Sequence, residues 1–280
     1  MRTSGYKFGR KNNWRRWSWN AIKERLPVSP INAVGLYLAG SDDLDRPVAI
    51  SKGFKEENLI AVDVNALAVT KLRKQKRIAL NLEISHVIGN WRNPKLSFVS
   101  ADLCSGLTAH SENLLKSFLY STGVEDHCVI ALNMLRGRDD TDWLKYYKNK
   151  LSTCDRNSFF EASRDLVPNP FGQIELHRGV AVVLTLMDVF MNLAKKTSLL
   201  SEDKSTSIRQ MSGILIKMNP TFNSYKSKKL TMDSVVFVWP LHGPWLDYKP
   251  KTQKDTAAKR QIAAMKAIRT MRYNKKENQK

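Results

Sequence analysis

The sequence predicts an α/β fold in which a doubly wound, mostly parallel sheet ends in an antiparallel hairpin. Short apolar segments alternate with helical patterns from about residue 33, a long apolar helix follows, and two further apolar segments come after it. The first five apolar segments are expected to form parallel strands covered on both faces, because each of them is largely apolar. These strands are predicted at residues 33–40, 58–65, 77–81, 95–103 and 127–135.

Four helices are predicted between the strands, at residues 44–54, 66–76, 82–91 and 111–123. Pro47 falls in the first turn of the first helix, where a missing backbone N–H costs nothing. Gly53 and Gly123 stand near the ends of the first and the last of these helices, as is typical of helix termination.

The pattern changes in the second half of the chain. Residues 139–170 are polar and aromatic, which indicates an insertion or a substrate-facing subdomain, and residues 173–196 read as a long apolar helix. Residues 213–219 and 234–240 are predicted strands joined by the polar segment 221–233. We expect this pair to form an antiparallel hairpin that closes the sheet.

The positive charge of the chain is concentrated at its two ends. The chain has 46 Lys and Arg against 26 Asp and Glu, a formal net charge of +20. Residues 1–29 hold eight basic side chains against one acidic, and residues 249–280 hold eleven against two. We therefore predict a basic arm at residues 1–30, an α/β domain at residues 31–248, and a second basic arm after it. This charge favours a polyanionic partner, which is a nucleic acid or an acidic membrane surface.

The first arm mixes aromatic and basic side chains. Trp14 and Trp17 flank Arg15 and Arg16, and Trp19 follows two residues later. In such a segment the tryptophans can stack on bases while the arginines neutralise phosphates. We predict that Arg15, Arg16 and Trp17 bind DNA or RNA. The alternative is that the tryptophans dock the arm on the domain and that the arginines are solvated.

The second arm is predicted to contain an amphipathic helix. Ile262, Met265 and Ile268 have helical spacing within a segment rich in Lys, Arg and Ala. Lys259 and Arg260 are the candidate nucleic-acid-binding residues of this arm. A helix that binds a protein partner has the same pattern, so that alternative stays open.

Composition excludes several classes of protein. Three cysteines and the absence of a CxxC motif or a Cys/His cluster exclude a disulfide scaffold and predict no metal site. The most apolar run, residues 179–194, is too short to span a bilayer and carries Asp188. A cytoplasmic protein without membrane segments is therefore expected.

Polar residues and one glycine stand at the carboxyl ends of the predicted parallel strands. Gly40 follows the first strand in GLYLAGSDDLDR, Asp63 ends the second, and Asn81 ends the third. Asp102 ends the fourth strand in ADLCSGLT, and Asn133 ends the fifth in LNMLRGRDD. Because ligands of open parallel sheets gather at this edge, these residues are the candidates for a binding site.

With this order of elements, residues 31–240 resemble the class I S-adenosylmethionine-dependent methyltransferases. The resemblance implies that Gly40 lies in the turn that approaches the cofactor, although only one glycine of that motif is present. Tyr37 stands where the family usually has an acid. Asp42 and Asp43 are expected to meet the ammonium group of S-adenosylmethionine instead, directly or through water.

The resemblance also implies how the nucleoside is bound. Asp63 is expected to accept hydrogen bonds from both ribose hydroxyls, because a carboxylate can accept from two donors at once. A helix N-cap is the alternative for Asp63, and an NAD-binding fold would use an acid in the same way. Asn81 is expected either to accept a hydrogen bond from the adenine amino group or to cap the following helix.

The acceptor side is expected at the ends of the fourth and fifth strands. By resemblance, Asp102 lies next to the transferred methyl group, and Asp102 and Asn133 are the predicted catalytic residues. Arg136 and Arg138 emerge beside the cleft and are predicted to grip a phosphate of the substrate. Pairing of these arginines with nearby aspartates is the alternative.

The leading hypothesis is therefore an S-adenosylmethionine-dependent methyltransferase that acts on nucleic acid. The alternative is a non-catalytic protein of the same fold that binds nucleic acid or serves in assembly, which the reduced glycine motif favours. A nicotinamide-dependent oxidoreductase fits less well, because GxGxxG is missing.

Overall fold

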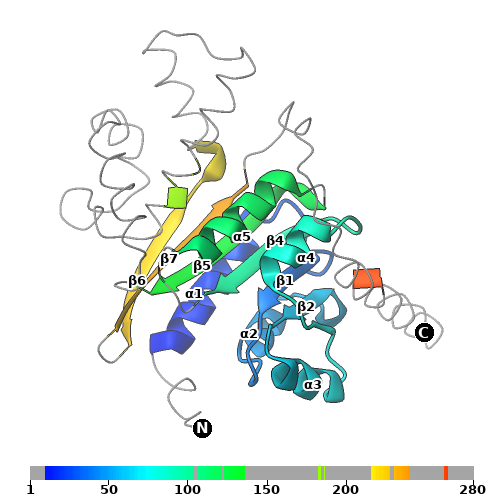
Figure 1. Ribbon diagram of the computed structural model, residues 1–280. Helices are drawn as coiled ribbons and strands as arrows, with labels where there is room; N and C mark the ends of the chain where they lie inside the picture. The colour runs from blue at the N-terminus through cyan, green and yellow to red at the C-terminus, as the bar shows by residue number, and fades with distance from the viewer. Residues whose placement is uncertain are drawn as a thin grey trace.

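The computed structural model places a seven-stranded sheet at the centre of the molecule (Figure 1). It describes residues 10–103, 106, 108–121, 123–135, 182–183, 186, 216–227, 230–239 and 262–263. The strand order is β3-β2-β1-β4-β5-β7-β6. The strands are β1 (Gly35–Leu38), β2 (Leu59–Val62), β3 (Ala79–Leu80), β4 (Leu96–Asp102), β5 (Val124–Leu135), β6 (Thr221–Ser227) and β7 (Leu230–Val238).

The first five strands are parallel, and β7 runs antiparallel to both β5 and β6. This arrangement confirms the predicted fold class. The helices are α1 (Arg10–Arg25), α2 (Asp45–Ser51), α3 (Ala66–Lys74), α4 (Ile84–Asn90) and α5 (Ala109–Tyr120), with a short 3-10 helix at Glu56–Asn58.

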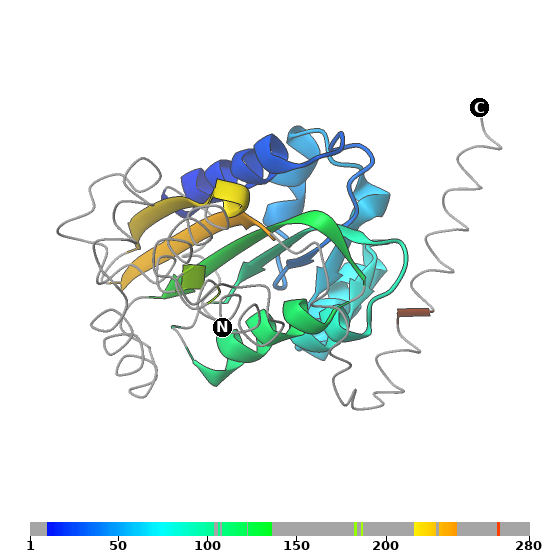
Figure 2. The same cartoon turned by 90° about the horizontal axis from the view of Figure 1, so that it is seen from above.

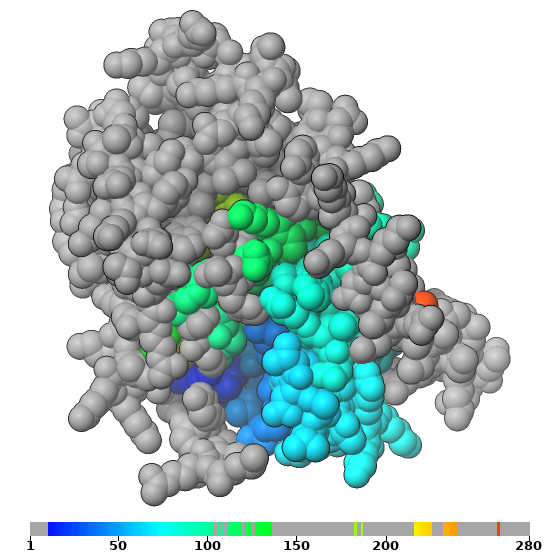
Figure 3. All heavy atoms as spheres, viewed as in Figure 1, coloured from blue at the N-terminus to red at the C-terminus, as the bar shows by residue number. Residues whose placement is uncertain are grey.

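Helices cover both faces of the sheet, as parallel strands require. Residues of α4 and α5 pack in one apolar cluster, while residues of α1, α2 and α3 pack in a second cluster on the other face. Figure 2 shows α1 and α5 on opposite sides of the strands. In the space-filling view of Figure 3, the blue-to-cyan first part of the chain lies beside the green of α5.

Close contact between β1 and β4 depends on one glycine. A Cβ atom on Gly35 would lie 2.5 Å from both the ring and the carbonyl oxygen of Phe98, which is far inside van der Waals contact. Gly35 therefore lets the central pair of strands pack against a large buried ring.

The predicted hairpin exists, but its first strand was placed wrongly. Residues 216–218 are helical, whereas β6 occupies Thr221–Ser227 within the segment that was predicted to be a polar connection. Strand β6 is the edge strand and pairs only with β7 among the described strands. An edge strand carries polar side chains, so its sequence resembles a loop.

The predicted first arm is largely a helix of the domain. Trp14 and Trp19 are buried, and Trp19 packs with its ring centroid 5.2 Å from that of Phe54 and 5.5 Å from that of Phe98. The alternative in which the tryptophans dock the first arm on the domain therefore describes α1. Arg16 is exposed, and Trp17 packs partly buried against the second cluster.

Several predictions fall on residues outside the described part of the chain. These are the insertion at 139–170, Arg136, Arg138, Lys259 and Arg260. Within the predicted long helix, Val182, Val183 and Leu186 are helical and buried, and Ile262 of the second arm is buried against the cluster of α4 and α5. Among the described residues, no helix is long and apolar enough to cross a membrane.

We expect Trp19→Ala to lower the free energy of unfolding by about 3–5 kcal/mol, because it empties a fully buried aromatic site between α1 and the sheet. Urea unfolding measures this difference. The matched control is Asn20→Ala, at the next and exposed position, which should change stability by less than about 0.5 kcal/mol. Equal stability of the two variants would show that α1 does not belong to the domain core.

Candidate functional site

A cleft of about 500 Å³ opens at the carboxyl ends of β1, β2 and β4. Its walls come from the loop after β1, the loops after β2 and β3, the end of β4, and helix α1. The lining residues are Lys11, Arg15, 38–42, Leu44, Asp45, Asp63, Val64, 82–84, Asp102 and Leu103. The structure thus brings together Gly40, Asp42, Asp63 and Asp102 from the predicted site.

The loop after β1 turns sharply beside the cleft. Gly40 has φ 61° and Asp43 has φ 47°, both in the left-handed region. A Cβ atom on Gly40 would meet no atom within 4 Å, so the backbone angle alone explains the glycine. One glycine and one aspartate therefore shape this turn.

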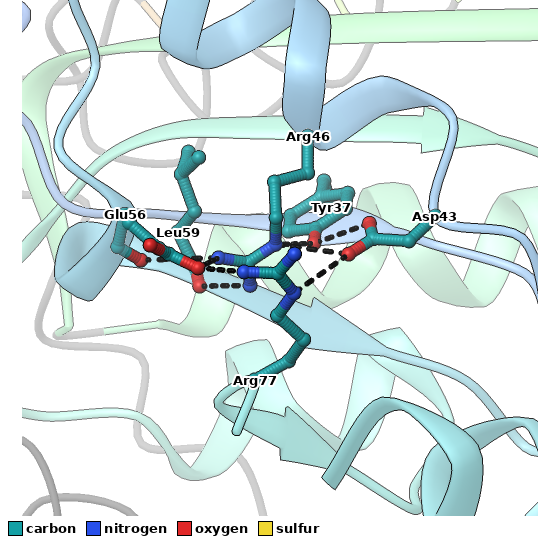
Figure 4. A network of polar contacts seen from close by, with 6 residues as sticks. All are labelled: Tyr37, Asp43, Arg46, Glu56, Leu59 and Arg77. Carbon is teal, nitrogen blue, oxygen red and sulfur yellow. Dashed lines mark hydrogen bonds and ion pairs between the residues drawn. The ribbon is translucent and has the colours of Figure 1, made fainter. Parts of the chain in front are cut away.

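A polar network holds the turn on the side away from the cleft, and its members Tyr37, Asp43 and Arg46 are buried (Figure 4). Tyr37 donates its hydroxyl hydrogen to Asp43 Oδ1 at 2.7 Å, and Arg46 Nε donates to Asp43 Oδ2 at 2.9 Å. The Arg46 guanidinium also reaches Glu56 Oε1 at 3.2 Å, and Arg77 contacts both acids. Burial, followed by the neighbouring Asp43 charge, raises the pKa of Tyr37 well above its usual value, so Tyr37 stays a donor.

The network holds Asp43 away from the cleft, which corrects the expectation that this acid meets the ammonium group. Asp43 faces Tyr37 and Arg46 and is not among the residues that line the cleft, so only Asp42 of the two acids lines it. Tyr37 anchors the turn through its hydrogen bond to Asp43. The Asp42 carboxylate is 3.3 Å from Lys71 Nζ.

The carboxylate of Asp63 lies on the cleft wall and is half-buried. Its Oδ1 accepts a hydrogen bond from the backbone N–H of Asn65 at 2.8 Å. The N-cap of α3 is Asn65, whose side chain accepts from the backbone N–H groups of Leu67 and Ala68. The capping alternative for Asp63 is therefore wrong.

Asn81 supports the site from outside the cleft wall. Its amide donates to the carbonyl oxygens of Asp63 at 3.1 Å and Val64 at 2.9 Å, which ties the end of β3 to the loop after β2. The N-cap of α4 is Glu83, so the capping alternative for Asn81 is wrong as well. The cleft wall at this strand is formed by the next residues, 82–84.

Asp102 and Asn133, predicted from two different strands, are in direct contact. Asn133 Nδ2 donates to Asp102 Oδ1 at 2.9 Å, and Lys11 Nζ lies 2.7 Å from Asp102 Oδ2. Asn133 is fully buried, and Ser234 Oγ donates to its Oδ1 at 2.7 Å. The Asn133 amide is also 3.3 Å from the hydroxyl of Tyr225. Both oxygens of Asp102 are thus held by nitrogen donors.

A second ion pair joins α1 to the start of α2. Arg15 Nε lies 3.2 Å from Asp45 Oδ2, and the Trp19 indole donates to Asp45 Oδ1 at 3.0 Å. Burial raises the pKa of Asp45, although Arg15 and the Trp19 hydrogen bond oppose that shift. Arg15 is buried, whereas an arginine that follows a phosphate backbone must be exposed.

The sequence interpretation missed Lys11, Arg15, Asp45 and Glu83 as cleft residues. A signal for the first two was present, because positions 11, 15 and 19 are four residues apart and lie on one face of a helix. The residues that contact this face of the helix could not be predicted, because Asp45 and Asp102 are distant from it in sequence.

The cleft is acidic although the chain is basic. Five carboxylates line it, from Asp42, Asp45, Asp63, Glu83 and Asp102, against the two cationic side chains Lys11 and Arg15. Among the described residues, no group of histidine, cysteine or acidic side chains has the arrangement of a metal site. This environment favours an organic ligand with positive charge and hydrogen-bond donors.

The sheet has five parallel strands followed by an antiparallel hairpin, with a cleft at the carboxyl ends of the parallel strands. The fold is that of the class I methyltransferases. No protein-family model and no curated protein matches the chain.

Similar solved structures include two enzymes. The plantazolicin methyltransferase BpumL, in complex with a pentazolic desmethylPZN analogue and SAH, is 12% identical with a TM-score of 0.38, over 85% of this chain and 86% of that one. The cyclopropane synthase MmaA2 from Mycobacterium tuberculosis is 9% identical with a TM-score of 0.37, over 84% of this chain and 88% of that one. The strand order of the chain itself defines its fold.

We expect Arg46→Met to lower the free energy of unfolding by about 3–5 kcal/mol, because it leaves the Asp43 carboxylate buried without its closest cation. Chemical denaturation measures the loss. Arg16→Met is the matched control, since Arg16 is exposed, and it should shift stability by less than about 0.5 kcal/mol. A similarly small effect in both variants would contradict the role of the network.

Proposed function

We propose that the chain is an S-adenosylmethionine-dependent methyltransferase that acts on nucleic acid. The observation that carries this proposal is the acidic cleft at the carboxyl ends of β1, β2 and β4, with Asp63 on its wall. S-adenosylmethionine supplies an electrophilic methyl group on a sulfonium.

The cleft suits the chemistry of this molecule. S-adenosylmethionine carries an ammonium and a sulfonium cation, and the excess of carboxylates favours both. Asp63 would accept hydrogen bonds from the ribose diol, and Asp42 would meet the ammonium group. Apolar Val64, Leu82 and Ile84 at the ends of β2 and β3 supply a surface for the adenine ring.

The same cleft argues against a dinucleotide. A pyrophosphate in such folds lies at the N-terminus of the helix after the first strand, where the backbone N–H groups favour an anion. Here the first residue of α2 is Asp45, whose carboxylate lines the cleft. Asp45 and Asp42 would repel a pyrophosphate, so an NAD-dependent reaction is disfavoured.

The residues of this chain would act mainly by alignment. Methyl transfer requires the nucleophile to approach the methyl carbon in line with its bond to sulfur, and positioning supplies much of the rate enhancement. Asp102 is presented by Asn133, whose own amide is held by Ser234 and contacts Tyr225. Asp102 would accept a hydrogen bond from the acceptor and orient its lone pair.

A nucleic-acid acceptor is supported by the charge of the chain. The net charge of +20 and the eleven basic residues at 249–280 suit a phosphate backbone, and exposed Arg16 can contribute from α1. The non-catalytic alternative is favoured by Lys11 and Arg15, which already neutralise Asp102 and Asp45 in the cleft.

If Asp63 holds the ribose, we expect Asp63→Ala to weaken S-adenosylmethionine binding by about 1.5–3 kcal/mol, the value of charge-assisted hydrogen bonds. Isothermal titration calorimetry measures the affinity. Glu24→Gln serves as the control, because Glu24 is exposed on α1 and is not among the cleft residues. Unchanged affinity in Asp63→Ala would rule out the ribose role, and no binding to the unmodified protein would rule out the methyltransferase.

If the basic terminal segment binds phosphates, DNA or RNA affinity should fall steeply as the salt concentration rises. Deletion of residues 249–280 should flatten this dependence, since it removes eleven basic and two acidic side chains, a net +9 of the +20. Fluorescence anisotropy with labelled oligonucleotides at several salt concentrations measures both. An identical salt dependence before and after the deletion would refute nucleic-acid binding by this segment.

A further inference from the structure

The ammonium group of Lys11 lies at the acceptor end of the cleft. Its Nζ is 2.7 Å from Asp102 Oδ2. Both residues line the same cleft as Gly40 and Asp63. Only a tenth of the Lys11 side chain is exposed. A primary amine from the first helix is therefore buried against the carboxylate proposed to orient the acceptor.

Lys11 differs from the other described lysines in this respect. No other lysine is among the residues that line the cleft, and Lys71, which pairs with Asp42, is half exposed on α3. Arg15 also lines the cleft, but the lone pairs of a guanidinium group are delocalised over its three nitrogens, so it is a poorer nucleophile than an amine. Lys11 is thus the one amine that the described structure places at this position.

We infer that Lys11 Nζ is a methyl acceptor of this protein, modified within its own cleft, and that the acceptor position is built for an amino group. This inference rests on the proposed function. It also names the substrate class, because an external acceptor would present an amino group to Asp102 in place of Lys11. Nucleobases carry such amino groups.

The reaction balances with the sulfonium donor as the second substrate. The uncharged Lys11 amine, having lost its ammonium proton to water, forms a bond from Nζ to the methyl carbon. The carbon–sulfur bond breaks, and its electron pair stays on sulfur as the neutral thioether S-adenosylhomocysteine. The product is an N-methylated Lys11 side chain whose protonated secondary amine keeps the ion pair with Asp102.

The first experiment incubates the full chain with S-adenosylmethionine and maps methyl groups by peptide mass spectrometry. We expect one added methyl group on Lys11 and none after Lys11→Arg, which retains a cation for Asp102. Lys23→Arg is the matched control, because Lys23 is an exposed lysine on the same helix, and it should leave Lys11 methylation unchanged. The rate constant should not depend on protein concentration, since the reaction is intramolecular.

A second measurement does not depend on turnover. Acetic anhydride labels lysine amines according to their accessibility, and S-adenosylhomocysteine bound in the cleft should slow the labelling of Lys11 at least several-fold but not that of Lys23. Asp102→Asn should retain S-adenosylhomocysteine binding while Lys11 methylation falls at least tenfold, because the amine is no longer held in place.

The outcomes separate this inference from the proposed function. If calorimetry detects S-adenosylmethionine binding while Lys11 stays unmethylated and unprotected, the inference is overturned and the proposed function stands. Methylation of exposed lysines at the rate of Lys11 also overturns it. If no binding is detected, the proposed function itself fails.

Discussion

The docking of helix α1 on the sheet is the constraint on which the rest of the structure depends. Lys11–Asp102 and Arg15–Asp45 are buried ion pairs that join this helix to β4 and α2, while Trp19 fills the apolar space beside them. Such pairs contribute little net stability, because removing two charges from water offsets their attraction. They define position instead, since a shift of α1 by one residue would separate each of these buried charges from the opposite charge that it pairs with. The end of the cleft at Asp102 therefore has one defined geometry.

The turn after β1 shows how side chains can replace a glycine-rich motif. Only Gly40 stands at this turn, and Asp43 adopts a positive φ of 47° without being glycine. That conformation costs energy for a residue with a Cβ atom. Hydrogen bonds from Tyr37 and Arg46 to the Asp43 carboxylate stabilise it. A polar network thus fixes the loop beside the cleft, although the turn contains only one glycine.

The chain as a whole is basic, whereas its cleft is acidic. The whole chain carries +20, which favours encounter with a polyanion, whereas five of the seven charged side chains lining the cleft are acidic. The acidic cleft of this basic chain favours a small ligand with positive charge. Lys11 connects the two properties, because it is a basic residue of the first helix that reaches the acidic cleft.

The sequence by itself determined the parallel strands and the strand-end residues Gly40, Asp63 and Asp102 that line the cleft. Apolar segments that end in Asp63 and Asp102 alternate with helical patterns, which predicts parallel strands. The carboxyl ends of parallel strands lie at one edge of the sheet, where the cleft is found. It did not place β6, since an edge strand has a loop-like composition, and it could not choose between a free and a docked α1. Only the tertiary structure decided that Lys11 and Arg15 reach Asp102 and Asp45, and that Asp43 turns away from the cleft. The physical reason is that ion pairs between residues distant in sequence depend on how helices and strands pack. The sequence around one charged residue does not predict which distant residue it will contact.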